Sequence, residues 1–352
     1  MIHISISNDQ SLKIKNLWCS WFFKRSKIDE FINILDGDDI FRNFFFEDSK
    51  DYALWKHAFY SDPIIVKDTV WQAPIIEYFF KDLSNVNIVV AKHKKILKAN
   101  TKAFLLRNYN NYRSSTILPQ IIDVMNIQVC PYCNRNFIES YSVTPKNGHK
   151  KTYFKGDLDH HYSKDEVPAL MLSFYNLIPC CKVCNHEKRE STSRPFYPYY
   201  NHEDIEYHFA IELYDETDEK DPIYDRPIDN IENKRFDSTV WQGISDNFNI
   251  KLKGIVNSEL NECMKNSNIL FRLEKKYNHS KEYVKELIRK KYIYPEIRKD
   301  ELLKNFPDIF QNESELAEAF YSFSSNTENY HNRPLSKLTK DILSQLDSQS
   351  LW

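Results

Sequence analysis

Glycine is scarce in this chain, with only five among 352 residues, and long apolar runs are missing as well. Because a phosphate-cradling loop needs closely spaced glycines, neither a Walker A loop nor a dinucleotide-binding fingerprint can be assembled. If nucleotide hydrolysis belongs to the function, we expect another chain to supply it. No apolar run reaches membrane-spanning length, and the first residues lack the basic head and apolar stretch of a signal peptide. We therefore expect a cytoplasmic protein without a membrane partner.

An excess of charge of either sign is also missing, since the formal net charge is −2. Any nucleic-acid contact must therefore come from a local patch. One stretch, from Leu83 to Ile122, contains no aspartate or glutamate. A solvated helix face would explain it, whereas the complete absence of acid favours phosphate contact or partner docking. Our candidate nucleic-acid contacts in this stretch are Lys92, Lys95 and Arg107.

Hydrophobic periodicity divides the chain into helical ends and a middle with β character. Apolar residues recur at spacings of three and four from Ile28 to Ser84, with aspartates suited to N-caps. Two β-like runs flank the turn-rich TPKNGHK and predict a hairpin, while IEYHFAIELYD and FNIKLKG predict paired strands. We expect an α+β protein with a helical region at 1–125, a cysteine-rich core at 126–200, and a β-hairpin plus helical region at 201–352.

Five of the seven cysteines fall in the central core, and four of them form two CxxC pairs. The pairs are Cys130 with Cys133 and Cys181 with Cys184. This spacing lets two thiolates on a tight turn reach one ion, and two such pairs complete the closed tetrahedral site that suits zinc. A thioredoxin-like redox pair is the alternative, but it would be a single CxxC beside a βαβ pattern, which is not visible. Cys180 is a further thiol that we expect to pack as a small apolar residue.

The stretch DLDHHYSKD at 157–165 begins at the end of the second β-like run, KTYFKGDLD, and combines acids with two histidines. A hydrolytic site needs a base that activates water and a cation that stabilises charge on phosphate. Asp159 could hold Mg²⁺ or Mn²⁺ while the neutral imidazole of His160 takes the proton of water. An isolated Asp-His pair is weak evidence, and Asn176 and Asn185 strengthen it.

Three segments together, CPYC at 130–133, LDHHY at 158–162 and SFYNLIPCCKVCNHEK at 173–188, resemble a known family. They look like the CxxC…DH…N…CxxCN pattern of HNH nucleases with the ββα-metal fold. The resemblance covers residues 127–198 and is specific because its elements occur in order with sensible gaps. It implies a zinc-braced ββα-metal core flanked by mostly helical N-terminal and C-terminal regions.

The resemblance also implies roles for individual residues. His160 would be the general base, and Asn176 would fix the loop that aims it. Asp159 and Asn185 would hold the catalytic Mg²⁺ or Mn²⁺, and the two CxxC pairs would hold a structural zinc ion. Lys188 stands where such motifs often carry a basic residue and could contact phosphate.

Two positions depart from the pattern. His161 occupies a place that is usually apolar or aromatic, and Ser163 occupies one where proline is common. His161 could be an extra ligand, a rival base or a packed side chain, and His160 is favoured as base because it follows the motif's aspartate directly. His186 is a lesser rival to Asn185 as a ligand.

A second resemblance, to long HNH proteins of bacterial anti-phage systems such as the HNH component of Septu, rests on the general residue pattern outside the motif. The segments that carry it are CPYCNRNF, LSFYNLIP, YPYYNHED and RPLSKLTKDIL. That resemblance implies a nuclease effector acting on nucleic acid, and we expect DNA rather than RNA as its substrate. It also implies control by a separate ABC- or SMC-like ATPase, in agreement with the missing Walker A loop.

Two alternatives to a DNA endonuclease stay open. One is a zinc-ribbon module that binds nucleic acid or protein without catalysis, against which the joint presence of Asp159, His160, Asn176 and Asn185 argues. The other is a tRNA-cutting ribonuclease effector, which differs in substrate rather than in mechanism. The motif cannot separate DNA from RNA, because its chemistry addresses only phosphate and water.

Overall fold

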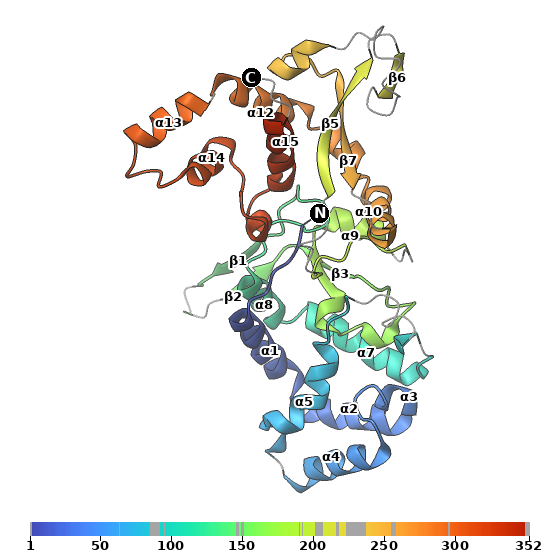
Figure 1. Ribbon diagram of the computed structural model, residues 1–352. Helices are drawn as coiled ribbons and strands as arrows, with labels where there is room; N and C mark the ends of the chain where they lie inside the picture. Colours follow the sequence, from blue (N-terminus) through green and yellow to red (C-terminus); the bar gives the residue numbers. More distant parts are fainter. Residues whose placement is uncertain are drawn as a thin grey trace. The chain divides into compact units, whose positions relative to one another are not determined.

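The computed structural model describes residues 2–62, 64–84, 92–94, 96–145, 148, 151–189, 191, 193–200, 207–215, 218–222, 237–254, 258–294 and 296–348. The chain is α+β and mostly helical, with small antiparallel sheets (Figure 1). Among the described residues, no helix is both long and apolar enough to cross a membrane.

The chain forms two compact units. The N-terminal unit comprises Ile4–Gln128 and Phe137–Tyr200, and the C-terminal unit comprises Met1–His3, Val129–Asn136 and Asn201–Trp352. The regions expected at 1–125 and 126–200 thus fall largely into one unit, apart from the short segment around the first CxxC pair.

Twelve helices and strands are described in the N-terminal unit. They are α1 (Asn8–Phe22), α2 (Arg25–Gly37), α3 (Asp39–Arg42), α4 (Ser49–Ser61), α5 (Thr69–Phe79), α7 (Ala99–Arg113), α8 (Ile117–Met125), β1 (Ser140–Val143), β2 (Lys151–Phe154), β3 (Asp157–His160), β4 (Leu177–Cys180) and α9 (Lys182–Lys188). The predicted helices between Ile28 and Ser84 are confirmed. Asp38, Asp48 and Asp68 each accept backbone N–H bonds at the start of α3, α4 and α5, because these N–H groups have no partner within the helix.

Aromatic packing holds this helical part together. The indoles of Trp55 and Trp71 stack at 4.4 Å between ring centroids, and each indole N–H donates to the other residue's carbonyl oxygen at 2.8 and 3.0 Å. Buried indoles usually need such a partner for their N–H. Tyr78 of α5 donates to the carbonyl oxygen of Ala169, at 2.9 Å, and so ties the helices to the loop between β3 and β4.

The N-terminal unit contains two small antiparallel sheets. β1 pairs with β2, with Tyr141 opposite Tyr153, which confirms the predicted hairpin. β3 pairs with β4, with Asp157 opposite Cys180 and His160 opposite Leu177. α9 begins directly after β4 and packs on β3. The segment from β3 to α9 is therefore two antiparallel strands followed by a helix.

The C-terminal unit contains a three-stranded sheet and helices. They are β5 (Tyr207–Asp215), β6 (Asp218–Pro222), β7 (Phe248–Gly254), α10 (Ser258–Phe271), α11 (Leu273–Asn278), α12 (Lys281–Ile293), α13 (Glu296–Asn305), α14 (Glu313–Tyr321) and α15 (Ser336–Ser348). The strand order is β6-β5-β7, and the predicted pairing of β5 with β7 is confirmed. β6 lies within the acidic, proline-containing segment DETDEKDPIYDRP at 215–227, of which residues 216–217 and 223–227 lie outside the described residues.

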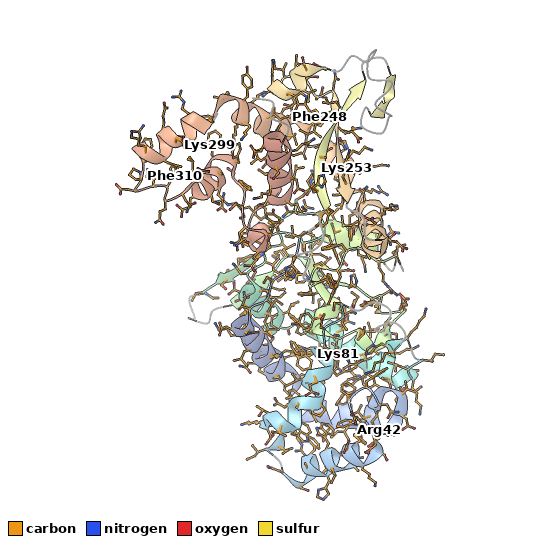
Figure 2. The ribbon with its side chains drawn as sticks, in the orientation of Figure 1. Arg42, Lys81, Phe248, Lys253, Lys299 and Phe310 are labelled. Atoms are coloured by element: carbon orange, nitrogen blue, oxygen red, sulfur yellow. The ribbon has the colours of Figure 1, made fainter. Side chains whose placement is uncertain are left out.

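Side chains from two helices bond to the backbone of this sheet. Gln345 of α15 accepts from the N–H of Ile211 and donates to its C=O, at 2.8 and 3.0 Å. Asn278 of α11 does the same to Ile250 of β7, at 2.9 Å for both bonds. Near the end of β7, Lys253 projects from the strand (Figure 2) and pairs with a buried glutamate of β5.

Candidate functional site

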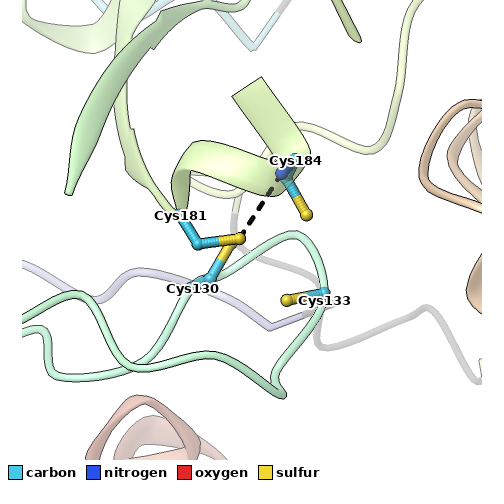
Figure 3. Close-up of side chains that lie close together, drawn as sticks. All are labelled: Cys130, Cys133, Cys181 and Cys184. Carbon is cyan, nitrogen blue, oxygen red and sulfur yellow. Dashed lines mark hydrogen bonds between the residues drawn. The ribbon is translucent and has the colours of Figure 1, made fainter. Parts of the chain in front are cut away.

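The two CxxC pairs form one buried cluster (Figure 3). The Sγ atoms of Cys130, Cys133, Cys181 and Cys184 all lie within 4.8 Å of one another. Zn–S bonds of about 2.3 Å place tetrahedral sulfurs about 3.8 Å apart, so the four thiols need only small shifts to bind one ion. The cluster could therefore hold a zinc ion.

Each cysteine pair lies on a well-supported turn. Cys181 caps the N-terminus of α9, where its sulfur accepts the N–H of Cys184 at 3.4 Å. The carbonyl oxygen of Cys133 accepts the hydroxyl of Tyr277 at 2.6 Å. Cys180 lies outside the cluster, in β4, and burial raises the pKa of its thiol well above the usual value. Cys180 is therefore a protonated, packed thiol, as expected from the sequence.

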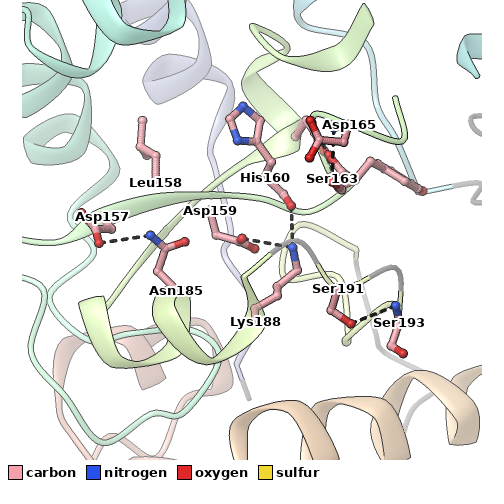
Figure 4. Close-up of polar contacts among 12 residues, drawn as sticks. Asp157, Leu158, Asp159, His160, Ser163, Asp165, Asn185, Lys188, Ser191 and Ser193 are labelled. Carbon is pink, nitrogen blue, oxygen red and sulfur yellow. Dashed lines mark hydrogen bonds and ion pairs between the residues drawn. The ribbon is translucent and has the colours of Figure 1, made fainter. Parts of the chain in front are cut away.

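Alternate residues of β3 face α9 (Figure 4). The side chains of Asp157 and Asp159 share one face of the strand because their spacing is two. Asp157 accepts from the amide nitrogen of Asn185 at 3.1 Å, and Asp159 accepts from the ammonium of Lys188 at 3.0 Å. The spacing of three between the helical residues places both on the side of α9 that meets the strand.

Lys188 and Asp159 form a deeply buried ion pair. Their side chains are 1% and 3% exposed, and the Lys188 ammonium also donates to the carbonyl oxygen of His160 at 2.6 Å. Because Lys188 is enclosed, its ammonium is not presented to a phosphate in this structure. Sequence reasoning missed this burial, since a lysine near a helix end is usually solvated.

His160 lies on the opposite face of β3, with its Nε2 atom 3.0 Å from the carbonyl oxygen of Met171. A carbonyl oxygen can only accept, so Nε2 carries the proton and Nδ1 keeps the lone pair. Burial lowers the pKa of His160 to about 4, so the ring is neutral at pH 7. A neutral imidazole with a defined tautomer can accept a proton at Nδ1.

Asn176 fixes the loop that follows His160. It is fully buried, its Oδ1 accepts the N–H of Tyr162 at 2.7 Å, and its Nδ2 donates to the carbonyl oxygens of Tyr162 and Leu170 at 3.2 and 3.1 Å. Leu170 precedes Met171, whose carbonyl oxygen faces the His160 ring. The Asn176 amide thus holds both the segment after His160 and the segment that contacts its ring.

Two residues of α7 contact β3, and sequence reasoning did not assign them to the site. The ring of Tyr109 lies 4.4 Å from that of His160, and its hydroxyl donates to the carbonyl oxygen of Leu158 at 3.2 Å. One helical turn later, Arg113 pairs with Asp157 at 2.7 Å. Their spacing of four indicated a shared helix face, but no sequence signal named β3 as its partner.

Two of the three predicted basic contacts lie among the described residues. Lys92 is exposed, and Arg107 is exposed and pairs with Glu30 of α2. Lys95 lies outside the described residues. The basic stretch is therefore partly neutralised by acids from elsewhere in the N-terminal unit.

His161 and His186, the other two histidines of the predicted motif, lie in different environments. His161 is buried against the ring of Tyr197 at 4.7 Å, and its Nδ1 has no hydrogen-bond partner among the described residues. Burial lowers the pKa of His161 well below the usual value. His186 is exposed on α9, where its ring lies 3.4 Å from the Arg189 guanidinium.

Replacing Lys188 with methionine removes the ammonium from the buried Asp159 carboxylate. Breaking a buried pair from one side costs about 3–5 kcal/mol, and we expect the free energy of unfolding in urea to fall by that amount. The double variant Lys188→Met/Asp159→Asn removes both charges and should recover much of the loss. Equal losses in the single and double variants would contradict a role for the ion pair in stability.

Comparison with family models, curated proteins and solved structures finds no match for this chain.

Proposed function

We propose that this protein is a metal-dependent HNH endonuclease that hydrolyses phosphodiester bonds of nucleic acid, DNA rather than RNA. The observation that carries the proposal is the state of His160. Its neutral ring is held on β3 with Nε2 bonded to the Met171 carbonyl and Nδ1 left as the proton acceptor. Asp159 precedes it on the same strand, and Asn185 lies on the adjoining helix.

The chemistry follows from these side chains. Nδ1 of His160 would take the proton of the attacking water. Burial keeps the ring neutral at pH 7, and the same lowered pKa makes Nδ1 a weaker base than a free imidazole. Asp159 and Asn185 would hold Mg²⁺ or Mn²⁺, and carboxylate and amide oxygens are the donors that such hard ions prefer. The bound ion would supply stabilisation of the negative charge that develops on the phosphate. Asn176 keeps the His160 loop in place throughout.

The cysteine cluster takes a separate, structural role in this proposal. Four thiolates complete a tetrahedral zinc shell and leave no open position for a substrate or water. Zinc at this cluster would fix Cys181 and Cys184 at the start of α9, and hence Asn185, the next residue along the helix.

We further propose that the protein is the cytoplasmic effector of an anti-phage defence system, controlled by a separate ABC- or SMC-like ATPase. Support comes from the similarity of its flanking segments to such effectors and from its five scattered glycines, which cannot form a phosphate loop.

A zinc-ribbon binding module without catalysis is the second candidate. The observation that favours it is the ion pair of Lys188 with Asp159, because an ammonium already neutralises the carboxylate that would hold the catalytic ion.

A cleavage assay separates these candidates. The purified chain, alone and with the product of its neighbouring gene, is incubated with plasmid DNA, phage DNA and total tRNA. We expect DNA cleavage only when Mg²⁺ or Mn²⁺ is added, and faster cleavage with the neighbour. Stoichiometric zinc without cleavage of any substrate would support the binding module, and cleavage of tRNA alone would identify the ribonuclease effector.

A further inference from the structure

The β1–β2 hairpin presents an exposed aromatic and basic face. Tyr141 and Tyr153 are cross-strand partners whose rings stack at 5.5 Å between centroids, and Tyr141 is 41% exposed. The ammonium of Lys151 lies 5.2 Å from the Tyr153 ring, and that of Lys155 lies 5.9 Å from the Tyr141 ring. We call these four residues the hairpin face.

The charge of this segment has one sign. From Ser140 to Gly156 the sequence contains four lysines and no aspartate or glutamate. Two acids flank this segment. Glu139 is exposed, and its carbonyl oxygen accepts the N–H of Lys155 at 2.9 Å, whereas Asp157 is paired with Arg113. The hairpin face therefore offers positive charge and aromatic surface together, the combination that binds the backbone and bases of single-stranded nucleic acid.

The hairpin is joined closely to the strand that carries the candidate site. Lys155 precedes Asp159 by four residues, a span of roughly 14 Å at most. At the junction, a Cβ on Gly156 would fall against the Phe154 ring and 2.9 Å from the carbonyl oxygen of Cys180. Only glycine fits this close approach, and just two residues, Lys155 and Gly156, separate β2 from β3.

We propose that the hairpin face binds an unpaired strand of nucleic acid and guides it toward β3. This inference rests on the proposed nuclease function. An unpaired strand is favoured over a duplex because a base must leave its own stack to lie on a tyrosine. A stacked base contributes about 5- to 150-fold in affinity, whereas an exposed cation–π contact contributes about 2- to 5-fold. A base can therefore displace a lysine from its ring, and the lysine then pairs with a phosphate.

The test compares two double variants with the same chemical changes. Tyr141→Ala/Lys155→Gln alters the hairpin face, and Tyr60→Ala/Lys50→Gln alters exposed residues of α4 in the same unit. Binding of a labelled single-stranded oligodeoxynucleotide is measured by fluorescence anisotropy without added Mg²⁺ or Mn²⁺. We expect the hairpin variant to raise Kd roughly 10- to 100-fold, and the control to bind like the wild type.

Two further measurements show whether a loss of affinity in the hairpin variant comes from the missing aromatic ring and the missing positive charge. Tyr141→Phe keeps the ring and should retain wild-type affinity. The hairpin double variant should lower the slope of log K against log salt by about 0.7, the value for one phosphate contact on a single strand. An unchanged Kd in the hairpin variant would overturn the proposal, and so would an equal loss of affinity for duplex and single-stranded DNA.

Failure of this inference and failure of the proposed function give different results. The binding assay needs no catalysis, so it is informative even if no substrate is cleaved. If the chain is a nuclease, the hairpin variant should still hydrolyse the small diester bis(p-nitrophenyl) phosphate at the wild-type rate. Wild-type cleavage of single-stranded DNA by that variant would reject the hairpin face while leaving the nuclease intact.

Discussion

His160→Ala is expected to lower the rate of metal-dependent cleavage by about 10²- to 10⁴-fold, the usual contribution of a positioned general base. The loss follows from removing Nδ1, the proton acceptor whose tautomer is set by the bond from Nε2 to the Met171 carbonyl oxygen. Plasmid nicking under Mn²⁺ measures the rate. Zinc content and the far-ultraviolet circular dichroism spectrum should match those of the wild type, since the cysteine cluster is untouched.

The neighbouring histidine is the matched control. His161 is also buried, but its ring packs on Tyr197, and we expect His161→Ala to keep cleavage within about tenfold of the wild type. Wild-type cleavage by His160→Ala would show that His160 is not the base. If His161→Ala lost cleavage while His160→Ala kept it, His161 would be the general base.

Cys184→Ser is expected to remove the zinc and with it the order of α9. Apparent binding energies of structural zinc reach about 10–16 kcal/mol in small domains, so loss of one thiolate should lower the unfolding midpoint strongly. Zinc per chain is measured by mass spectrometry, and stability by urea denaturation. Cleavage should vanish too, because Asn185 follows the lost ligand directly.

Cys180→Ala is the control for this variant. Cys180 is buried in β4 and lies outside the thiol cluster, so its removal should leave zinc at the wild-type level. Full zinc content in Cys184→Ser would contradict four-thiol coordination. Loss of zinc in Cys180→Ala would place Cys180 among the ligands.

Local patterns made much of this structure predictable. The two CxxC spacings predicted a single cluster, and the four thiols do meet. Hydrophobic periods of 3.6 and 2 predicted the helices after Ile28 and the strand pairs β1–β2 and β5–β7. The hydrophobic periods depend only on residues close together in the sequence. The zinc signal depends on cysteine, a residue type with few other roles at such spacings. Both signals can therefore be recognised before the tertiary structure is known.

Tertiary partners could not be predicted in the same way. The stretch from Leu83 to Ile122 contains no acid, but acids from other elements lie next to it in the fold. Arg107 forms an ion pair with Glu30, and Arg113 forms one with Asp157. Lys188 looked like a phosphate contact because nothing in sequence revealed that Asp159 lies within 3.0 Å of it. Pairing of charges across elements depends on the packing angle of helices and strands, which local propensity does not determine.

The side-chain bonds to β5 and β7 have a consequence for how another protein can dock. At Ile211 and Ile250, glutamine and asparagine amides already satisfy the backbone groups that an added strand would use. An extended segment from a partner, or from a second copy of this chain, therefore cannot extend the sheet at these positions by β-augmentation. The same two amides therefore also oppose edge-to-edge aggregation, which occurs when the unpaired backbone groups of an exposed strand bond to a strand of another molecule.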